Sequence, residues 1–294
     1  MILASIALVS SKDPTVTLSS GTVLNGKVCS GFEQQGIRCF LGIPYAEPPI
    51  NENRFRPPLP FNYTGIESLD TTSSGAKCYQ GAALKPSEDC LFLDVYAPPE
   101  GVAPKAVMVW IHGGCFTMGG PNNYPGSDLV DTADVLVVVI HYRLGVFGYL
   151  GADQLRERDE EDHTTGNYAT LDALMSLKWI QDYASAFGPV PEKITVFGQS
   201  SGACSVAQVI AVPEKFATYK GKKLFTSAIM ESGGFNQWAS TPMKVAQQQY
   251  ADIMAVLECS IDDVDCLIGK TAKEVQSAFG TASPGLNPRC RDAC

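Results

Sequence analysis

One serine of the chain lies between two glycines at a spacing that nucleophilic serines use. The stretch VFGQSSG, Val196–Gly202, places Ser200 two residues from Gly198 and two from Gly202. This spacing is typical of a nucleophile elbow, a sharp strand-to-helix turn that presents the serine hydroxyl to a substrate. About 0.2 such matches arise by chance in a chain of this composition, so the pattern needs support from its surroundings.

The residues around Ser200 predict the strand and the helix that an elbow needs. KITVF at 193–197 predicts a strand, and SGACSVAQVIA at 201–211 predicts a helix of small residues. Glycines at 198 and 202 let the two backbones approach closely, and the helix N-terminus favours negative charge beside the hydroxyl. A serine that only caps the helix explains this segment equally well.

A second glycine-containing stretch favours the catalytic interpretation. WIHGGCF at Trp110–Phe116 follows an apolar strand and precedes the elbow in the chain. Oxyanion loops of esterases lie at this place, and their glycines let backbone amides come close to a substrate carbonyl. An ordinary glycine turn is the alternative, but two such features in the right order rarely coincide by accident.

The elements that position these motifs indicate an α/β fold. Apolar runs at 105–111 and 135–140 are typical of strands covered on both faces, and residues 167–187 carry apolar side chains at helical spacing. A further buried strand is expected from Lys222. Strands that alternate with helices predict a mostly parallel central sheet flanked by helices.

Two segments nearer the N-terminus predict antiparallel additions to this sheet. Residues 21–45 contain two β-prone pieces around a glycine-containing turn, which predicts a hairpin. LFLDVYAPP from Leu91 alternates apolar and polar residues, which predicts a strand with one face in water.

Charge and hydropathy exclude several classes of partner. The formal net charge is −9, and no run of lysine or arginine occurs, so nucleic acid is not expected to bind. The longest apolar run, VLVVVI at Val135–Ile140, is far shorter than the ~20 residues of a transmembrane helix, and we expect none.

The ten cysteines indicate disulfides more than a metal site. Eight of them bracket short polar or glycine-containing loops, whereas no CxxC occurs and the three histidines lie far away in sequence, so no metal is expected. Cys115 and Cys204 remain, and we expect them to be small buried hydrophobes. The expected pairs are Cys29 with Cys39, Cys78 with Cys90, Cys259 with Cys266 and, less strongly supported, Cys290 with Cys294.

Disulfides would place the protein in an oxidising compartment. The sequon NYT makes Asn62 a candidate glycosylation site, and the apolar N-terminus predicts a short or clipped signal segment over residues 1–16. We therefore expect a secreted or extracellular protein.

Taken together, these motifs resemble the type-B carboxylesterase and cholinesterase family of α/β-hydrolases. The resemblance runs from about Thr17 to Lys273 and rests on FLGIPYAEPP, SEDCLFLDVYAP, VMVWIHGGCF, HYRLGVFGYL, GNYATLDALMSLKWIQDYASAFG, KITVFGQSSGACSV and AIMESG. It implies that Ser200 is the nucleophile and that a small-molecule carboxylic ester is the substrate, with no cofactor. It also implies that the amides of Gly114, Cys115 and Ser201 form the oxyanion hole, and that Cys78–Cys90 and Cys259–Cys266 are the family's loop disulfides.

Three positions depart from the pattern of this family. Gln199 stands where glutamate is usual, Ser201 where alanine is usual, and Cys115 where a third glycine is usual. Backbone amides donate whatever the side chain is, so the oxyanion hole is expected to form if Cys115 tolerates the required backbone angles. The loss of the carboxylate at Gln199, and the absence of tryptophan from the loop between Cys78 and Cys90, disfavour choline esters.

The base that should activate Ser200 is not found after it. Hydrolases of this fold place the acid and then the histidine beyond the serine, yet no histidine follows Ser200. His112 belongs to the oxyanion loop, His141 is expected at a strand end, and His163 lies in a charged stretch. We therefore expect residues 17–294 to be the N-terminal part of one hydrolase domain, inactive alone. A binding or adhesion protein that keeps the fold without turnover is the alternative.

Overall fold

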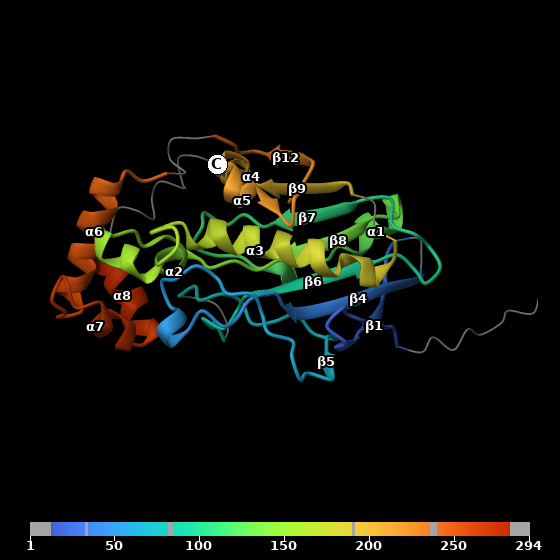
Figure 1. Cartoon of the computed structure of the whole chain (residues 1–294), viewed down its shortest axis with the longest axis horizontal. Coiled ribbons are helices and arrows are strands. Elements are labelled where there is room, and N and C mark those ends of the chain that lie inside the picture. The colour runs from blue at the N-terminus through green and yellow to red at the C-terminus, as the bar shows by residue number, and fades with distance from the viewer. Residues whose placement is uncertain (1–12, 33–34, 82–84, 190–191, 236–239, 283–294) are drawn as a thin grey trace, which may run out of the picture.

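A seven-stranded mixed sheet forms the centre of the structure, a computed structural model that describes residues 13–32, 35–81, 85–189, 192–235 and 240–282 (Figure 1). The spatial order is β12-β9-β7-β8-β6-β4-β3. The first four of these strands are mutually parallel, and the last three pair antiparallel. The strands are β3 (Lys27–Ser30), β4 (Gln35–Pro44), β6 (Phe92–Ala97), β7 (Val107–Ile111), β8 (Leu136–Ile140), β9 (Ile194–Gln199) and β12 (Ser227–Glu231).

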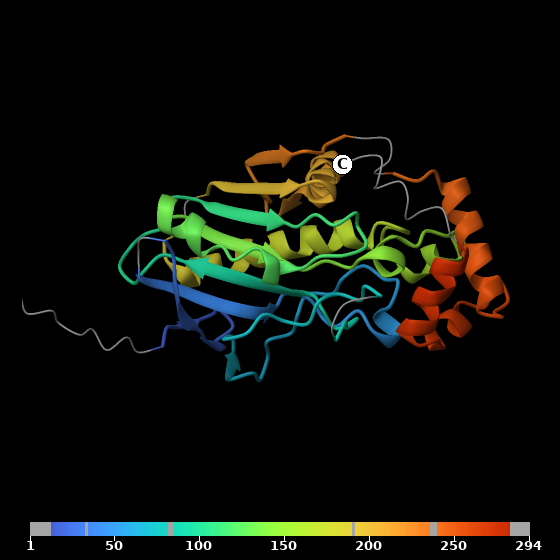
Figure 2. The same ribbon diagram turned by 180° about the vertical axis from the view of Figure 1, so that it is seen from behind.

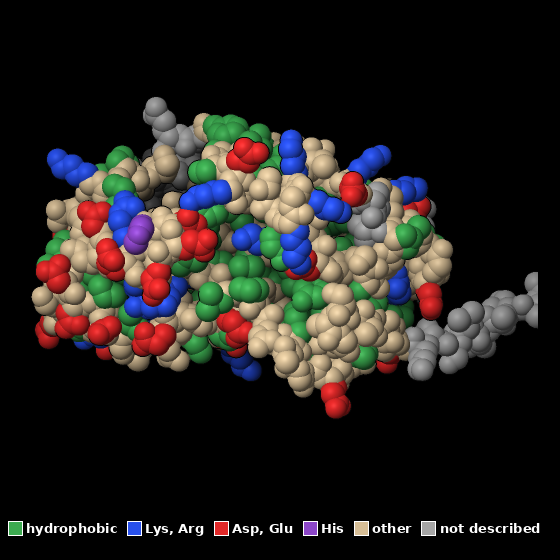
Figure 3. Space-filling model, in the orientation of Figure 1, with side chains coloured by type: hydrophobic (Ala, Val, Ile, Leu, Met, Phe, Trp, Pro, Cys, Tyr) green, Lys and Arg blue, Asp and Glu red, His purple; other side chains and the backbone are tan. Residues whose placement is uncertain are grey.

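Helices cover both faces of this sheet and gather at one of its ends. Figure 1 shows α3 (Tyr168–Tyr183), α4 (Ser201–Ala211) and α5 (Glu214–Ala217) on the near face, and Figure 2 shows α1 (Ser127–Ala133) on the other. The end group comprises α2 (Gly145–Tyr149), α6 (Met243–Val256), α7 (Val264–Gly269) and α8 (Ala272–Ala282). Acidic side chains are frequent on the surface over α6 to α8, at the left of Figure 3. The strands β7 and β9 point toward this end (Figure 2). The expected α/β fold with helices on both faces is confirmed.

Short elements complete the described part of the chain. The 3-10 helices are η1 (Asn51–Asn53), η2 (Pro121–Asn123), η3 (Asp153–Arg158) and η4 (Ala184–Phe187). One small sheet contains β1 (Thr15–Thr17), β2 (Val23–Asn25) and β5 (Ser68–Asp70), and another contains β10 (Thr218–Tyr219) and β11 (Lys222–Lys223).

The strand β8 shows why continuous apolar runs mark the centre of the sheet. Leu136, Val138 and Ile140 belong to the core beneath α3 and α4, whereas Val137 and Val139 belong to the core beneath α1. All five residues are buried, so alternate side chains serve opposite layers and none can be polar at low cost.

Two predictions about the N-terminal region need adjustment. The hairpin forms between β3 and β4, but β2, which was expected to be part of it, pairs with β1 in the small sheet. The expected signal segment ended at residue 16, yet Thr15 and Val16 already pair with Asn25 and Leu24. Folded structure therefore begins before residue 17, and residues 1–12 lie outside the described part.

The strand predicted after Lys222 forms as β12, but the prediction that it is buried is wrong. Strand β12 pairs with β9 on one side, and all five of its residues are exposed, including the apolar Ile229 and Met230. The reason is its place at the edge of the sheet, where the described residues provide no further strand. An exposed apolar edge of this kind is a site for pairing with another segment.

The three expected disulfides within the described residues are present. Cys29 pairs with Cys39, Cys78 with Cys90, and Cys259 with Cys266, across 10, 12 and 7 residues of sequence. The fourth expected pair, Cys290 with Cys294, lies outside the described residues.

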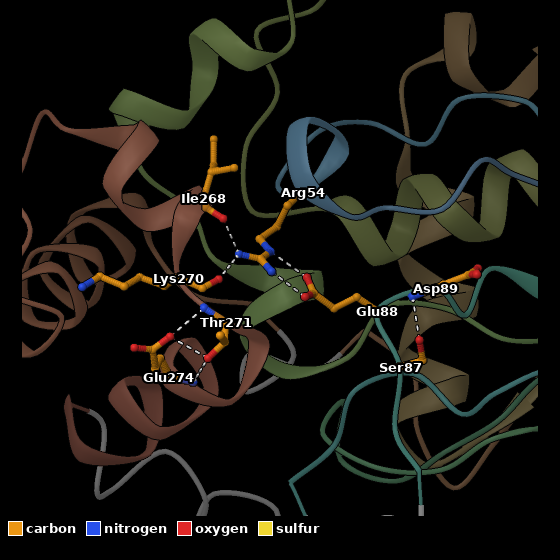
Figure 4. Close-up of polar contacts among 8 residues, drawn as sticks. All are labelled: Arg54, Ser87, Glu88, Asp89, Ile268, Lys270, Thr271 and Glu274. Atoms are coloured by element: carbon orange, nitrogen blue, oxygen red, sulfur yellow. Dashed lines mark hydrogen bonds and ion pairs between the residues drawn. The ribbon is translucent and has the colours of Figure 1, made fainter.

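Two buried ion pairs join segments that are distant in the sequence. Arg143, which follows β8, forms a bidentate pair with Asp172 of α3 at 2.6 Å, and neither side chain is more than 3% exposed. Arg54 pairs with Glu88 through two hydrogen bonds and donates to the carbonyl oxygens of Ile268 and Lys270, each at 2.7 Å (Figure 4). Because the guanidinium group of Arg54 donates to four acceptor atoms, and that of Arg143 donates to the Arg56 carbonyl oxygen at 2.8 Å as well as to Asp172, their charges are tolerated inside the protein.

Strand β6 was predicted to have one face in water, but its last five residues are buried. It lies between β8 and β4, and its polar residue Asp94 is fully buried. Asp94 accepts hydrogen bonds from the Gly42 amide at 2.8 Å and the Ser74 hydroxyl at 2.5 Å. Burial outweighs these bonds and raises the pKa of Asp94 to about 6.

This carboxylate predicts a pH-dependent stability. The folded protein holds the Asp94 proton up to about pH 6, whereas the unfolded chain releases it near its ordinary value of 3.8. The free energy of unfolding therefore falls as pH rises between these values, by about 3 kcal/mol for a two-unit shift. In Asp94→Asn, which cannot ionise, we expect this loss to disappear. Urea unfolding of both proteins at pH 4 and pH 7 checks it, and a pH-independent difference between them contradicts it.

Candidate functional site

Two adjacent parallel strands bring the glycine-rich loop and the serine turn together. Strands β7 and β9 pair in a register that sets Ile111 opposite Gly198. Both strands end within one residue of this pair or at it, so the segments that follow leave the sheet at the same edge. His112 and Gly113 therefore run beside Gln199 and Ser200.

The turn at Ser200 is strained in the manner of a nucleophile elbow. Ser200 has φ 56° and ψ −124°, a combination rare for a residue with a side chain. Its amide donates to the Glu231 carbonyl oxygen at 2.9 Å, and its carbonyl oxygen accepts the Cys204 amide at 3.1 Å as the first bond of α4. The side chain makes no capping hydrogen bond to the helix, so the alternative of a capping serine is not supported.

Both elbow glycines are required by the closeness of neighbouring backbone. A Cβ atom on Gly202 would lie 2.1 Å from the carbonyl oxygen of Ile111, and one on Gly198 would lie 2.7 Å from that same oxygen. Neither position can hold a side chain unless strand β7 moves. Ser200 itself is 8% exposed, so it is less accessible than the predicted elbow but is not fully enclosed.

The glycine loop, residues 112–120, follows β7 and lies directly against this turn. A Cβ atom on Gly113 would lie 2.7 Å from the Gln199 carbonyl oxygen and 3.2 Å from the Ser200 Cβ. Gly114 follows with φ 115°, and its carbonyl oxygen accepts the amides of Thr117 and Met118, both at 3.0 Å. The loop is therefore a tight turn whose residue Gly113 packs against Gln199 and Ser200.

Cys115 occupies the position where the resemblance implies a third glycine. It adopts φ 57°, in the left-handed region that glycine favours, and Phe116 after it has φ 59°. The backbone thus adopts left-handed angles at both positions, at a cost of roughly 1–2 kcal/mol for each side chain. The expectation that Cys115 is an unpaired buried thiol is wrong, because this cysteine is disulfide-bonded. Cys204 is fully buried in α4, as expected.

Amide groups suited to an oxyanion come from two elements at this edge. The Gly114 amide finds no backbone acceptor among the described residues, and Ser201 begins α4, where amides lack intrahelical acceptors. The helix N-terminus adds a favourable field for negative charge. That the amides of Gly114, Cys115 and Ser201 converge on one point stays a prediction.

None of the three histidines is placed to serve as a base. His112 is buried, stacks on Tyr142 at 4.5 Å, and donates from Nδ1 to the Gly113 carbonyl oxygen at 2.8 Å. Burial lowers the pKa of His112 to about 4, so the ring is neutral and supports the loop. His141 follows β8 and is buried, with its pKa lowered to about 3. His163 is exposed, as its charged surroundings predicted.

One supporting residue was missed by the sequence analysis. The Tyr142 hydroxyl donates to the His112 carbonyl oxygen at 2.6 Å from beneath the loop, while its ring stacks on the imidazole. HYRLG was noted only as a motif, because a tyrosine after a strand carries no sign of the partner it reaches 30 residues earlier.

Other kinds of site are not found in the part of the chain that the structure describes. No group of three or more potential metal ligands occurs there. The described helices also include none that is long and apolar enough to cross a membrane.

Comparisons with known proteins agree with this geometry. The sequence model described as the carboxylesterase family matches residues 12–287. The chain is 39% identical over 293 residues to carboxylesterase 1C of Mus musculus, covering 91% of this chain and 50% of that protein. It is 35% identical over 252 residues to para-nitrobenzyl esterase of Bacillus subtilis, covering 82% of this chain and 49% of that protein.

Solved structures give the same result for the fold. A carboxylesterase of Geobacillus stearothermophilus superposes with a TM-score of 0.80 at 32% identity, covering 92% of this chain and 54% of the other. The chain therefore spans about half the length of the proteins it matches. The family model covers nearly all residues of the chain, and the structure has the strained serine turn beside a glycine loop. The chain therefore belongs to the carboxylesterase family.

Proposed function

We propose that the protein is a serine hydrolase of carboxylic esters and that Ser200 attacks the ester carbonyl to form an acyl-enzyme. The observation that carries this proposal is the strained backbone of Ser200 at the β9–α4 junction, pressed against Gly113 of the neighbouring loop. Strain of this kind costs free energy, and it persists where it holds a side chain in a working position. A serine with a purely structural role would have no need of this backbone strain.

In this proposal, the oxyanion that forms during attack accepts hydrogen bonds from the amides of Gly114, Cys115 and Ser201. The left-handed angles of Cys115 support its part, because they keep the loop in the conformation that a glycine would adopt. Such preorganised donors each contribute on the order of 10²–10³ in rate.

The general base of this reaction is proposed to lie beyond Cys294. No histidine follows Ser200 in the sequence, and burial keeps His112 and His141 neutral and engaged in the fold. Two observations support a continuation: the chain spans about half the length of its relatives, and β12 leaves an apolar edge exposed among the described residues. The proposed mechanism would also need an acid and then a histidine after Ser200.

The substrate is proposed to be a small carboxylic ester without a quaternary ammonium group. Gln199, half-buried against the glycine loop, provides a neutral amide where a carboxylate would attract a cation. The same neutral residue is the one observation that favours the second candidate, a binding or adhesion protein without turnover.

Secretion and glycosylation are proposed alongside this activity. Three disulfides within the described residues suit an oxidising compartment. Asn62 is exposed in a loop, where its side chain accepts the Thr64 amide at 3.0 Å, so a glycan at this position would extend into solvent.

The first prediction of this proposal concerns chain length. Residues 1–294 alone should hydrolyse esters at a rate roughly 10⁴- to 10⁶-fold below that of a product continued through the C-terminal half of the family fold, since they lack a base for Ser200. Both products are assayed with a short-chain aryl ester, and Ser200→Ala of the longer product is the control. Equal turnover by the short chain, abolished by Ser200→Ala, would reveal a base within residues 1–294.

A second prediction tests the contact between the loop and the elbow. Gly113→Ala places a methyl group 2.7 Å from the Gln199 carbonyl oxygen, so the loop or the turn must shift. We expect kcat of the longer product to fall about 10- to 100-fold, since displacements near 1 Å cost about this much. Gly269→Ala is the matched control, because nothing lies within 4 Å of its added methyl group. Equal kcat for the two variants would show that the contact has no part in catalysis.

A further inference from the structure

The side chain of Gln80 forms two hydrogen bonds with the backbone of Gly119, near the end of the glycine loop. Its Oε1 accepts the Gly119 amide at 2.9 Å, and its Nε2 donates to the Gly119 carbonyl oxygen at 2.7 Å. The carboxamide thus satisfies both backbone groups of one residue, as a neighbouring strand would. Few side chains can do this, because the contact needs one donor and one acceptor side by side.

The position of Gln80 is itself fixed by the Cys78–Cys90 disulfide. Gln80 Nε2 also donates to the Cys78 carbonyl oxygen at 3.0 Å, which holds the side chain against its own backbone. Cys78 and Cys90 are both buried, and the Ser87 amide donates to the Lys77 carbonyl oxygen at 3.0 Å across the base of the same loop. The carboxamide is therefore held close to the Cys78 backbone, beside a buried disulfide.

Gly119 packs against His112 and Gly113, the two residues that precede the proposed oxyanion donor Gly114. A Cβ atom on Gly119 would be 2.4 Å from His112 Nδ1 and 2.7 Å from the Gly113 carbonyl oxygen. Gly119 also follows Met118, whose amide is bonded to Gly114. Moving Gly119 would therefore displace both the start and the return of the turn that carries the Gly114 amide.

We infer that Gln80 is a positioning residue for the glycine loop, which carries the proposed oxyanion donors. Gln80 links this loop to the backbone of Cys78, beside the Cys78–Cys90 disulfide. This inference rests on the proposed function, because it assigns Gln80 an effect on the rate of ester hydrolysis. Gln80 does not touch the substrate in this assignment. It acts through Gly119, which fixes His112 and Gly113, which in turn fix the Gly114 amide beside Ser200.

Two substitutions test this assignment in the longer product. Gln80→Met keeps the length and neutrality of the side chain but removes its three hydrogen bonds, two with Gly119 and one with the Cys78 carbonyl oxygen. Gln80→Glu keeps the acceptor and places a second carboxylate oxygen against the Gly119 carbonyl oxygen. We expect kcat to fall roughly 10- to 100-fold in both, with KM within about threefold, since substrate binding is not their target.

A matched control lies near the start of β9, whereas Ser200 follows the end of that strand. Gln181 Nε2 donates to the carbonyl oxygens of Lys223 and Leu224 at 3.2 and 3.3 Å, and the nearby Thr226 amide donates to the carbonyl oxygen of Ile194, the first residue of β9. Gln181→Met and Gln181→Glu make the same chemical changes there and should leave kcat unchanged. A wild-type kcat in Gln80→Met, or equal losses in Gln181→Met, would overturn the assignment.

A second measurement keeps this test separate from that of the proposed function. Hydrogen exchange of the peptide covering 113–120 should accelerate in both Gln80 variants, while that of strand β7 stays as in wild type. This readout needs no activity. If the longer product shows no Ser200-dependent hydrolysis, the proposed function fails and exchange alone decides whether Gln80 holds the loop. Unchanged exchange at 113–120 would overturn the assignment in either case.

Discussion

The close approach of strand β7 to the β9–α4 turn is the constraint on which the site depends. The Ile111 carbonyl oxygen lies so near Gly198 and Gly202 that a methyl group on either would clash with it. Because the two strands are parallel and in register, this contact also fixes where His112 and Gly113 leave the sheet. The contact of Ile111 with Gly198 and Gly202 therefore positions both the serine turn and the glycine loop, so a shift of one requires a shift of the other.

Polar groups inside the fold act as fasteners between the sheet and its surroundings. The Arg143–Asp172 pair ties the end of β8 to α3, and Asp94 joins β6 to the segments that carry Gly42 and Ser74. Each buried charge is matched by several hydrogen bonds, which limits the cost of its desolvation. Polar contacts as well as apolar packing therefore hold β6 and the end of β8 to their neighbouring segments.

The sequence predicted features whose causes are local, and it failed where the cause was distant. Glycine spacing around Ser200 and the apolar runs of β7 and β8 result from short-range geometry, and both were found. The alternation in β6 suggested a wet face because Asp94 gives no sign of its partners 20 and 52 residues away. Gln80 was missed for the same reason, since its partner Gly119 lies 39 residues further on.

The Arg54 cluster has a consequence for the order in which the chain acquires its structure. Arg54 and Glu88 are 34 residues apart, but the carbonyl oxygens of Ile268 and Lys270 lie 214 and 216 residues beyond Arg54. During synthesis from the N-terminus, the sheet strands up to β9 emerge long before these acceptors do. The helices α6 to α8 are thus the last described part to be secured, and until then the guanidinium group must find its remaining acceptors in water.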